Sequence, residues 1–254
     1  MIFIKRTKAF TLSEVLITLG IIGVVAALTI PVLMQKNKEV QTVSALKKAY
    51  SILQSAYTSA VQDDGTPDTW NAAAGVDVVS HFEPYLKVQS KQMSPDELKP
   101  MIGGGVIMGG LDIFGPQLTL SDGSIIAFTG FSTYHGGGTG CTRDVSDGSH
   151  TTPALEHVCQ WLIYDINGRQ GPNMMGYDGF GFYITTMGII PFGLPSDADG
   201  LSAGPYSTSR GCSTNNAWGG TPNGMGCTAW LIQVQNMDYL KCTDISWTGK
   251  RKCS

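Results

Sequence analysis

The N-terminal stretch from Lys5 to Met34 reads KRTKAFTLSEVLITLGIIGVVAALTIPVLM. Its start is basic, because Lys5, Arg6 and Lys8 come before the first acidic residue. The twenty residues from Val15 to Met34 then carry no charge. A helix of that length, rising about 1.5 Å per residue, crosses the roughly 30 Å hydrocarbon core of a bilayer. The sequence therefore predicts a membrane-spanning helix close to the N-terminus.

A cleaved secretory signal peptide is the simplest alternative for this stretch. It too has a basic start, an apolar core and small residues, here Val25-Ala26-Ala27, before a cut. The apolar core, however, is longer than the roughly 7–15 residues of a usual signal peptide. Glu14 also lies in the apolar segment, where a carboxylate costs about 2.5–3.5 kcal/mol near the bilayer centre and less towards an interface. Finally, the helical pattern continues beyond Met34, which disfavours a signal peptide.

The polar chain after Met34 keeps a helical period. Its apolar residues follow spacings of three and four, which is one stripe of an amphipathic helix: Val40, Val43, Leu46, Tyr50, Leu53, Tyr57 and Val61. Asp63-Asp64-Gly65-Thr66-Pro67 then ends the pattern. We therefore expect one helix of about fifty residues. Its first half is apolar all round, and its second half, over residues 35–63, packs on a globular domain.

The decapeptide KAFTLSEVLI at residues 8–17 resembles the class III signal of type IV pilins and type II secretion pseudopilins. The resemblance covers residues 5–34 closely. It implies that a prepilin peptidase cuts between Ala9 and Phe10 and methylates the new amine. Ala9 stands where the family usually has glycine. Since alanine is the smallest possible change, cleavage is still expected.

The resemblance also assigns roles to Glu14 and Pro31. Glu14 falls on the buried glutamate of the family, and Pro31 falls on its helix-kinking proline. In a filament, the amine of one Phe10 pairs with Glu14 of a neighbouring subunit and removes the penalty of an unpaired buried carboxylate. The alternative for Glu14 is a side chain that reaches the membrane interface. The alternative for Pro31 is a tolerated membrane proline, whose freed backbone carbonyl bonds to neighbouring groups.

Composition limits what the exported part can be. The 254 residues are 42% hydrophobic and 15% charged, whereas disordered chains combine low hydrophobicity with high charge. The formal net charge of −3 excludes a strongly basic nucleic-acid-binding domain. Neither a Walker A loop nor an HExxH motif occurs, and we expect no enzyme. The only basic cluster of the exported part, Lys250-Arg251-Lys252, is interpreted as a solvated tail or as a contact with DNA or lipid.

The cysteines predict disulfides. All six lie in the last 114 residues: Cys141, Cys159, Cys212, Cys227, Cys242 and Cys253. An even count in an exported, loop-rich segment is typical of a disulfide framework, although six cysteines allow fifteen connectivities. We favour the sequential pairing, because each bond then closes a short loop rich in Gly, Ser, Thr and Asn.

The sequence of the remaining exported part predicts the approximate positions of its helices, strands and loops. A helix is expected over residues 70–88 and a loop over residues 90–112. A hairpin is expected over residues 117–128, turned at or near Asp122-Gly123, with further strands over residues 161–165, 180–184 and 228–234. A long helix on an antiparallel sheet gives an α+β fold, as the pilin resemblance implies. The expected parts are a leader (1–9), an assembly helix (10–34), its amphipathic continuation (35–63) and an exported domain (64–254).

The segment at residues 165–178 reads DINGRQGPNMMGYD and resembles one common in large pilin-like proteins. Its oxygen side chains, at Asp165, Asn167, Asn173 and Asp178, suit calcium. The segment is no EF-hand, because Arg169 occupies the fifth loop position. The alternative is a plain turn, in which the Asx side chains bond their own backbone.

Together these patterns predict a structural subunit of a type IV pilus-like filament or a type II secretion pseudopilus. The alternative is a minor or tip pilin for adhesion or DNA uptake, and an exported enzyme on a pilin-like anchor is a third possibility. The expected partners are prepilin peptidase, other pilin or pseudopilin subunits and an inner-membrane assembly platform. Nucleic acid is expected only for a DNA-uptake pilin. The basic leader places residues 1–9 in the cytoplasm, so the protein spans the inner membrane once and exports its C-terminal domain.

Overall fold

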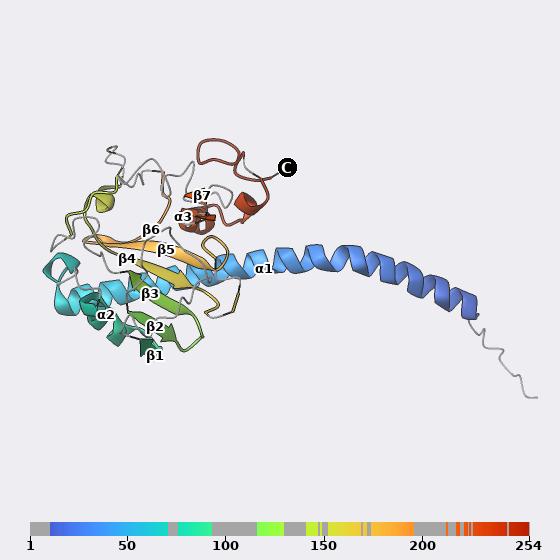
Figure 1. The fold of residues 1–254 in the computed structure, drawn as a ribbon, viewed down its shortest axis with the longest axis horizontal. Helices are drawn as coiled ribbons and strands as arrows, with labels where there is room; N and C mark the ends of the chain where they lie inside the picture. The colour runs from blue at the N-terminus through green and yellow to red at the C-terminus, as the bar shows by residue number, and fades with distance from the viewer. Residues whose placement is uncertain are drawn as a thin grey trace, which may run out of the picture. The chain divides into compact units, whose positions relative to one another are not determined.

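The structure is a computed structural model (Figure 1). It describes residues 11–70, 76–92, 116–129, 141–146, 148, 152–168, 170–171, 174–195, 212, 217–218, 221–222, 224, 226–242 and 244–253. The chain divides into two compact units, Met1–Gln41 and Thr42–Ser254. The long helix α1 (Leu12–Asp64) begins in the first unit and ends in the second. Residues Ala9, Phe10 and Asn173 lie outside the described residues.

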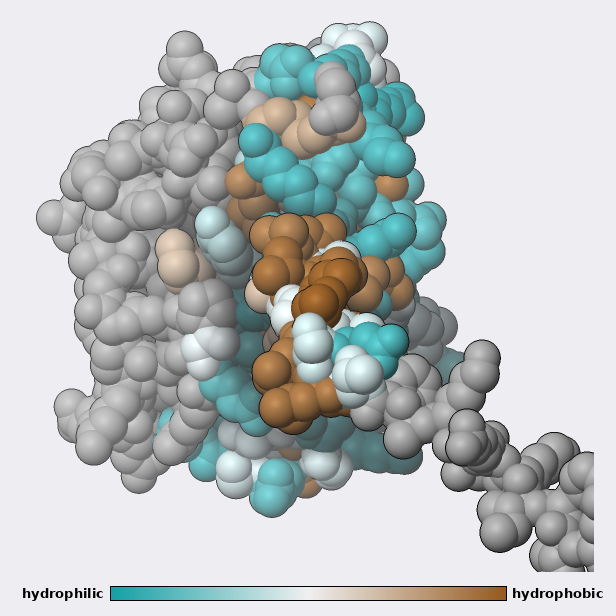
Figure 2. All heavy atoms as spheres, turned by 90° about the vertical axis from the view of Figure 1, so that its right-hand side faces the viewer, coloured by the Kyte–Doolittle hydropathy of each residue, from teal (hydrophilic) through white to brown (hydrophobic). Residues whose placement is uncertain are grey.

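Among the described residues, the first unit holds α1 as far as Gln41, most of which is the apolar segment that ends at Met34. Its large apolar side chains are exposed along the whole segment, from Leu12 at 78% to Met34 at 66%. The helix is long and apolar enough to cross a membrane, and it continues through Pro31. Figure 2, which faces this part of α1, shows such residues in brown. A helix that is apolar all round needs lipid or other helices as its surroundings.

The second unit is built on an antiparallel meander. Its six strands are hydrogen-bonded in sequence order: β1 (Val88–Gln92), β2 (Gln117–Leu120), β3 (Ile125–Thr129), β4 (Val158–Asp165), β5 (Gly179–Thr185) and β6 (Gly188–Pro191). A separate two-stranded sheet holds β7 (Ala217–Trp218) and β8 (Thr221–Pro222). This helix-and-sheet architecture confirms the α+β, pilin-like fold expected from the sequence.

The hairpin of β2 and β3 turns where the sequence predicts. The Oδ1 atom of Asp122 accepts hydrogen bonds from the backbone and the hydroxyl of Ser124, at 3.2 and 2.6 Å. Gly123 has a φ of +88°, a conformation that side chains disfavour. The Asp-Gly pair therefore supplies both the cap and the backbone freedom that the turn requires.

The second half of α1 packs on the sheet through the predicted stripe from Val43 onward, supplemented by small residues, whereas Val40, which the stripe also included, is 58% exposed. Its buried residues are Thr42, Val43, Leu46, Ala49, Leu53, Ala56, Tyr57 and Ala60. Tyr50 stacks on Phe182 of β5 with ring centroids 5.8 Å apart. Gln54 donates to the carbonyl of Ile189 at 2.8 Å and accepts from its amide at 3.4 Å. The helix thus bonds directly to the edge strand β6, an edge that would otherwise offer unpaired groups.

A second cluster of apolar residues is separate from the core that α1 helps to form. It contains Ile125, Val145, Leu155, Val158, Trp161, Ile163, Met175, Tyr183 and Phe192. Strands β4 and β5 are consequently buried along their whole lengths. Strands that are covered on both faces read as continuous apolar runs rather than as alternating patterns, which explains the sequences VCQWLIYD and GFGFYIT.

The expected strand at residues 228–234 is wrong. This segment lies in helix α3 (Cys227–Gln233), whose first five residues are buried. A short, fully buried apolar run does not distinguish a strand from a helix by its period. Here the contacts decide, because the Thr228 hydroxyl oxygen accepts the amide of Gly181 at 3.0 Å and the amide of Ala229 donates to Phe192 at 2.9 Å.

The expected helix over residues 70–88 is shorter in the structure. Helix α2 covers Val76–Phe82 and the 3-10 turn η3 covers Glu83–Tyr85, with β1 beginning at Val88. Pro84 has no amide to donate to the carbonyl of Ser80, four residues earlier, which accounts for the early end of α2. The expected loop at residues 90–112 is also wrong at its start, since residues 90–92 belong to β1 and residues 93–112 lie outside the described part.

Three disulfides staple the C-terminal region. They join Cys141 to Cys159, Cys212 to Cys227 and Cys242 to Cys253, and no cysteine is free. This is the sequential pairing that the sequence favours. The second bond holds the first residue of α3, so it fixes the helix that the sequence reading missed. In the chain-entropy description, a closed loop of about 15 residues contributes about 3 kcal/mol to stability.

Candidate functional site

The start of α1 is a capping box formed by Thr11 and Glu14. The Oε2 atom of Glu14 accepts hydrogen bonds from the amide and the hydroxyl of Thr11, both at 2.8 Å. In return, the Thr11 hydroxyl oxygen accepts the amide of Glu14 at 3.2 Å. This reciprocal arrangement satisfies donors that a helix N-terminus otherwise leaves unpaired. The sequence analysis missed the role of Thr11, although the T-x-x-E spacing that signals a capping box is present.

The capping box changes the expected state of Glu14 in a lone subunit. Its carboxylate lies at the positive end of the helix dipole, where negative charge is stabilised. Two donors already bond to Oε2, and a carboxylate has about four acceptor sites in all. A further donor can therefore bind without displacing Thr11. The capping box therefore holds the carboxylate in place and leaves it able to accept further hydrogen bonds.

The apolar part of α1 satisfies its own polar groups and leaves its small residues open. The hydroxyls of Thr18 and Thr29 donate to the carbonyls of Val15 and Val25, at 3.0 and 2.9 Å. Such bonding is what a helix in lipid requires. A Cβ atom added at Gly20 or Gly23 would meet nothing within 4 Å. These positions are therefore free for the close approach of a second helix.

Comparison with known families bears on this same segment. Residues 4–30 match the family model described as the prokaryotic N-terminal methylation motif. The chain carries the type IV pilin and pseudopilin signal. The match includes Ala9, Phe10 and Glu14, and Pro31 lies just after it. No curated protein and no solved structure matches the chain. The motif supports a pilin- or pseudopilin-type subunit that prepilin peptidase processes, with a membrane-anchored helix and an exported C-terminal domain.

The β4–β5 connection brings together three of the four expected calcium ligands. Asp165 and Asp178 are buried, at 0% and 3% exposure, and the Nδ2 atom of Asn167 donates to Asp178 at 3.4 Å. Burial raises the pKa of Asp165 to about 7, and the charge of Asp178 acts in the same direction. Within the described ranges, no group of three or more His, Cys, Asp or Glu side chains is arranged to hold a metal.

The same residues also form a turn. The Oδ1 atom of Asp165 accepts the amide of Asn167 at 3.1 Å, and Gly168 has a φ of +64°. A Cβ atom at Gly168 would lie 2.1 Å from the carbonyl oxygen of Gly123, so only glycine fits there. These contacts are the ones that a plain turn requires. Calcium stays a prediction, and a melting temperature that does not respond to calcium or to a chelator would leave only the turn.

Asp165 makes the free energy of unfolding of the second unit, Thr42–Ser254, depend on pH. Its pKa is about 7 in the fold and about 3.9 in an unfolded chain. The folded state therefore holds a proton that the unfolded state has released, and stability falls as the pH rises from about 4 to about 7. Denaturant unfolding at pH 5 and pH 8 checks this. The Asp165→Asn variant should lose most of the difference, whereas Asp68→Asn, at an exposed carboxylate, should keep it.

Proposed function

We propose that the protein is a structural subunit of a type IV pilus-like filament or a type II secretion pseudopilus, assembled from the inner membrane. The observation that carries this proposal is the methylation motif at residues 4–30, which includes most of the exposed apolar part of α1. The subunits pack through the apolar parts of α1, and prepilin peptidase and an inner-membrane assembly platform are the other partners. The protein acts mechanically, by polymerising from the membrane.

Glu14 and the amine of Phe10 form the proposed contact between neighbouring subunits. Cleavage after Ala9 creates this amine, and methylation keeps its charge. The capping box presents the Glu14 carboxylate at the start of α1 with acceptor sites to spare. Pairing of the two charges removes the cost of an unpaired buried ion, which gives both affinity and register to the packed helices. Pro31, which lacks an amide donor, is the proposed site of bending during packing.

A minor or tip pilin for adhesion or DNA uptake is the second candidate. The unit Thr42–Ser254 is large, and a bulky domain is accommodated more easily at a tip than along a shaft. A catalytic role has no comparable support. The pattern Gly200-Leu201-Ser202-Ala203-Gly204 has the spacing GxSxG, but it lies outside the described residues. That spacing indicates a nucleophile only on a strand-to-helix turn.

Processing tests the proposal directly. The mature chain should begin at methylated Phe10, because the cut faces the cytoplasm and its flanking residues fit the motif. Intact mass spectrometry of the membrane-bound protein should show the loss of nine residues and the gain of one methyl group. The Ala9→Gly variant, which restores the usual residue of the family, should be cleaved at least as completely. A mature chain that begins near Ala27 would instead indicate a secretory signal peptide.

A further inference from the structure

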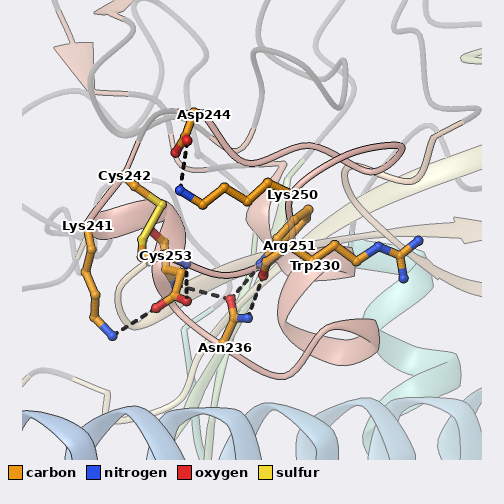
Figure 3. Close-up of a disulfide and its surroundings, with 9 residues drawn as sticks. Trp230, Asn236, Lys241, Cys242, Asp244, Lys250, Arg251 and Cys253 are labelled. Atoms are coloured by element: carbon orange, nitrogen blue, oxygen red, sulfur yellow. Dashed lines mark hydrogen bonds and ion pairs between the residues drawn. A yellow bond between two sulfur atoms is a disulfide. The ribbon is translucent and has the colours of Figure 1, made fainter.

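The C-terminal segment forms a loop that is bonded to the fold (Figure 3), defined here as the basic loop, residues 241–253. The disulfide between Cys242 and Cys253 closes it. Asp238, only 5% exposed, accepts the amide of Cys253 at 2.9 Å through Oδ2 and the ammonium of Lys241 at 3.0 Å through Oδ1. The Nδ2 atom of Asn236 donates to the carbonyl of Arg251 at 2.9 Å. These bonds fix the loop on the fold, so its charges have defined positions.

The basic loop differs in charge from the remainder of its unit. It contains four Lys or Arg residues and one acidic residue, Asp244, which gives a net charge of +3. Residues 42–240 contain 8 basic and 17 acidic residues, which gives −9. Arg251 and Lys252 are exposed. Lys250 pairs with Asp244 at 2.8 Å, whereas among the described residues Lys252 makes no hydrogen bond or ion pair, although its charge helps to lower the pKa of Asp238. An exposed, basic surface that these bonds hold on an acidic unit is a candidate contact surface.

The opposite end of the same unit is acidic. This acidic end comprises Asp63, Asp64, Asp68, Asp77 and Glu83, at the end of α1 and around α2. No Lys or Arg occurs between residues 49 and 86. Asp63 accepts a hydrogen bond from the Tyr85 hydroxyl, and Asp64 lies 2.7 Å from Nδ1 of His81. In Figure 1, α2 and the C-terminus lie at opposite ends of this unit.

We propose that the basic loop of one subunit docks on the acidic end of another copy of this chain. The inference rests on the filament assembly proposed above. When subunits stack with their helices parallel, one end of each exported unit faces the opposite end of the next. Contacts between two different surfaces generate open helical arrays when the rotation between successive subunits does not close a ring. Opposite charges at the two ends favour this stacking and disfavour head-to-head contacts between like charges.

A second copy fits the basic loop better than nucleic acid does. A phosphate backbone that approached the loop would also meet the field of a unit with a net charge of −9. Another subunit meets the same field, but filament packing would hold its acidic end against the basic loop at a range shorter than the Debye length of about 8 Å at physiological ionic strength, where the nearest charges dominate. Each exposed pair is weak, but the contact repeats at every subunit of the filament.

Zero-length cross-linking of purified filaments tests the contact. A carbodiimide joins a lysine amine to a carboxylate that touches it. We expect a cross-linked peptide that joins Lys250 or Lys252 to Asp63, Asp64 or Asp68. Because the two surfaces lie at opposite ends of one unit, this peptide must come from two subunits. Filaments that cross-link elsewhere but never between these two surfaces would overturn the proposal.

Charge reversal in the full-length chain provides the second test. Lys252→Glu and Asp68→Lys should each lower the yield of sheared filaments at least about threefold, since each replaces attraction by repulsion. The double variant should recover yield, because the reversed charges attract again. Lys87→Glu, which makes the same charge change on an exposed residue outside the basic loop, should assemble normally. Processed protein in the membrane is measured in parallel for every variant.

The outcomes distinguish this contact from the underlying function. If the wild-type chain forms no filaments, the proposed function itself fails. If it forms filaments and Lys252→Glu assembles as well as wild type, the docking contact fails while the function stands. A Lys252→Glu variant with normal filaments that bind less DNA than wild-type filaments would assign the basic loop to nucleic acid and overturn the proposal.

Discussion

A Glu14→Val variant should be inserted in the membrane and cleaved, yet it should be absent from filaments. Valine removes the cost of a carboxylate in the apolar segment, so the lone subunit should insert at least as well as wild type. The residues that flank the cut are unchanged, and we expect cleavage to proceed. Methylation should fall, because the pilin resemblance links this step to the glutamate. In a filament, the amine on a neighbour's Phe10 would be buried without a partner, at a cost of about 3–5 kcal/mol.

Two control variants separate the charge of Glu14 from its place in the capping box. Glu14→Gln keeps the spacing of the box, since glutamine serves at this position too, but it removes the charge. It should therefore fail in assembly as Glu14→Val does. Thr11→Ala removes the cap, worth about 1 kcal/mol, and keeps the charge, so it should still assemble. Membrane fractionation and filament shearing give the two readouts. Normal incorporation of Glu14→Gln would show that the charge is not the assembly contact.

The elements that the sequence predicts well are those with a local cause. Twenty uncharged residues specify an apolar helix by their length alone, and the stripe after Met34 specifies its buried face by its period. The β2–β3 hairpin follows from the Asp122-Gly123 pair. Thr11 belongs with these elements as well. A threonine three residues before a glutamate is the local sequence signature of a capping box. Local rules of this kind need no knowledge of the rest of the fold.

The elements that the sequence analysis misassigned depend on contacts that are distant in the chain. The segment after Cys227 is helical against β5, where Thr228 meets Gly181, 47 residues away. The same reason applies to the pKa of Asp165. Its rise follows from complete burial, and the sequence DINGR by itself describes an exposed turn. Burial and long-range packing are products of the whole fold, so periodicity and local propensity do not reveal them.

The packing of α1 on the sheet gives the second large effect, at Phe182. This side chain is fully buried, and its ring stacks on Tyr50 at 5.8 Å with an interplanar angle of 8°. Phe182→Ala removes the ring and leaves a cavity between α1 and β5, which should lower the free energy of unfolding by about 3–5 kcal/mol. Phe182→Leu fills most of the space and should cost clearly less.

Met187→Ala is the matched control, because Met187 is 64% exposed and should change stability by less than about 0.5 kcal/mol. Denaturant unfolding of a chain that begins at residue 35, after the apolar segment, measures the stability of all three variants. Equal losses for Phe182→Ala and Met187→Ala would contradict the packing of α1 against β5 through this ring.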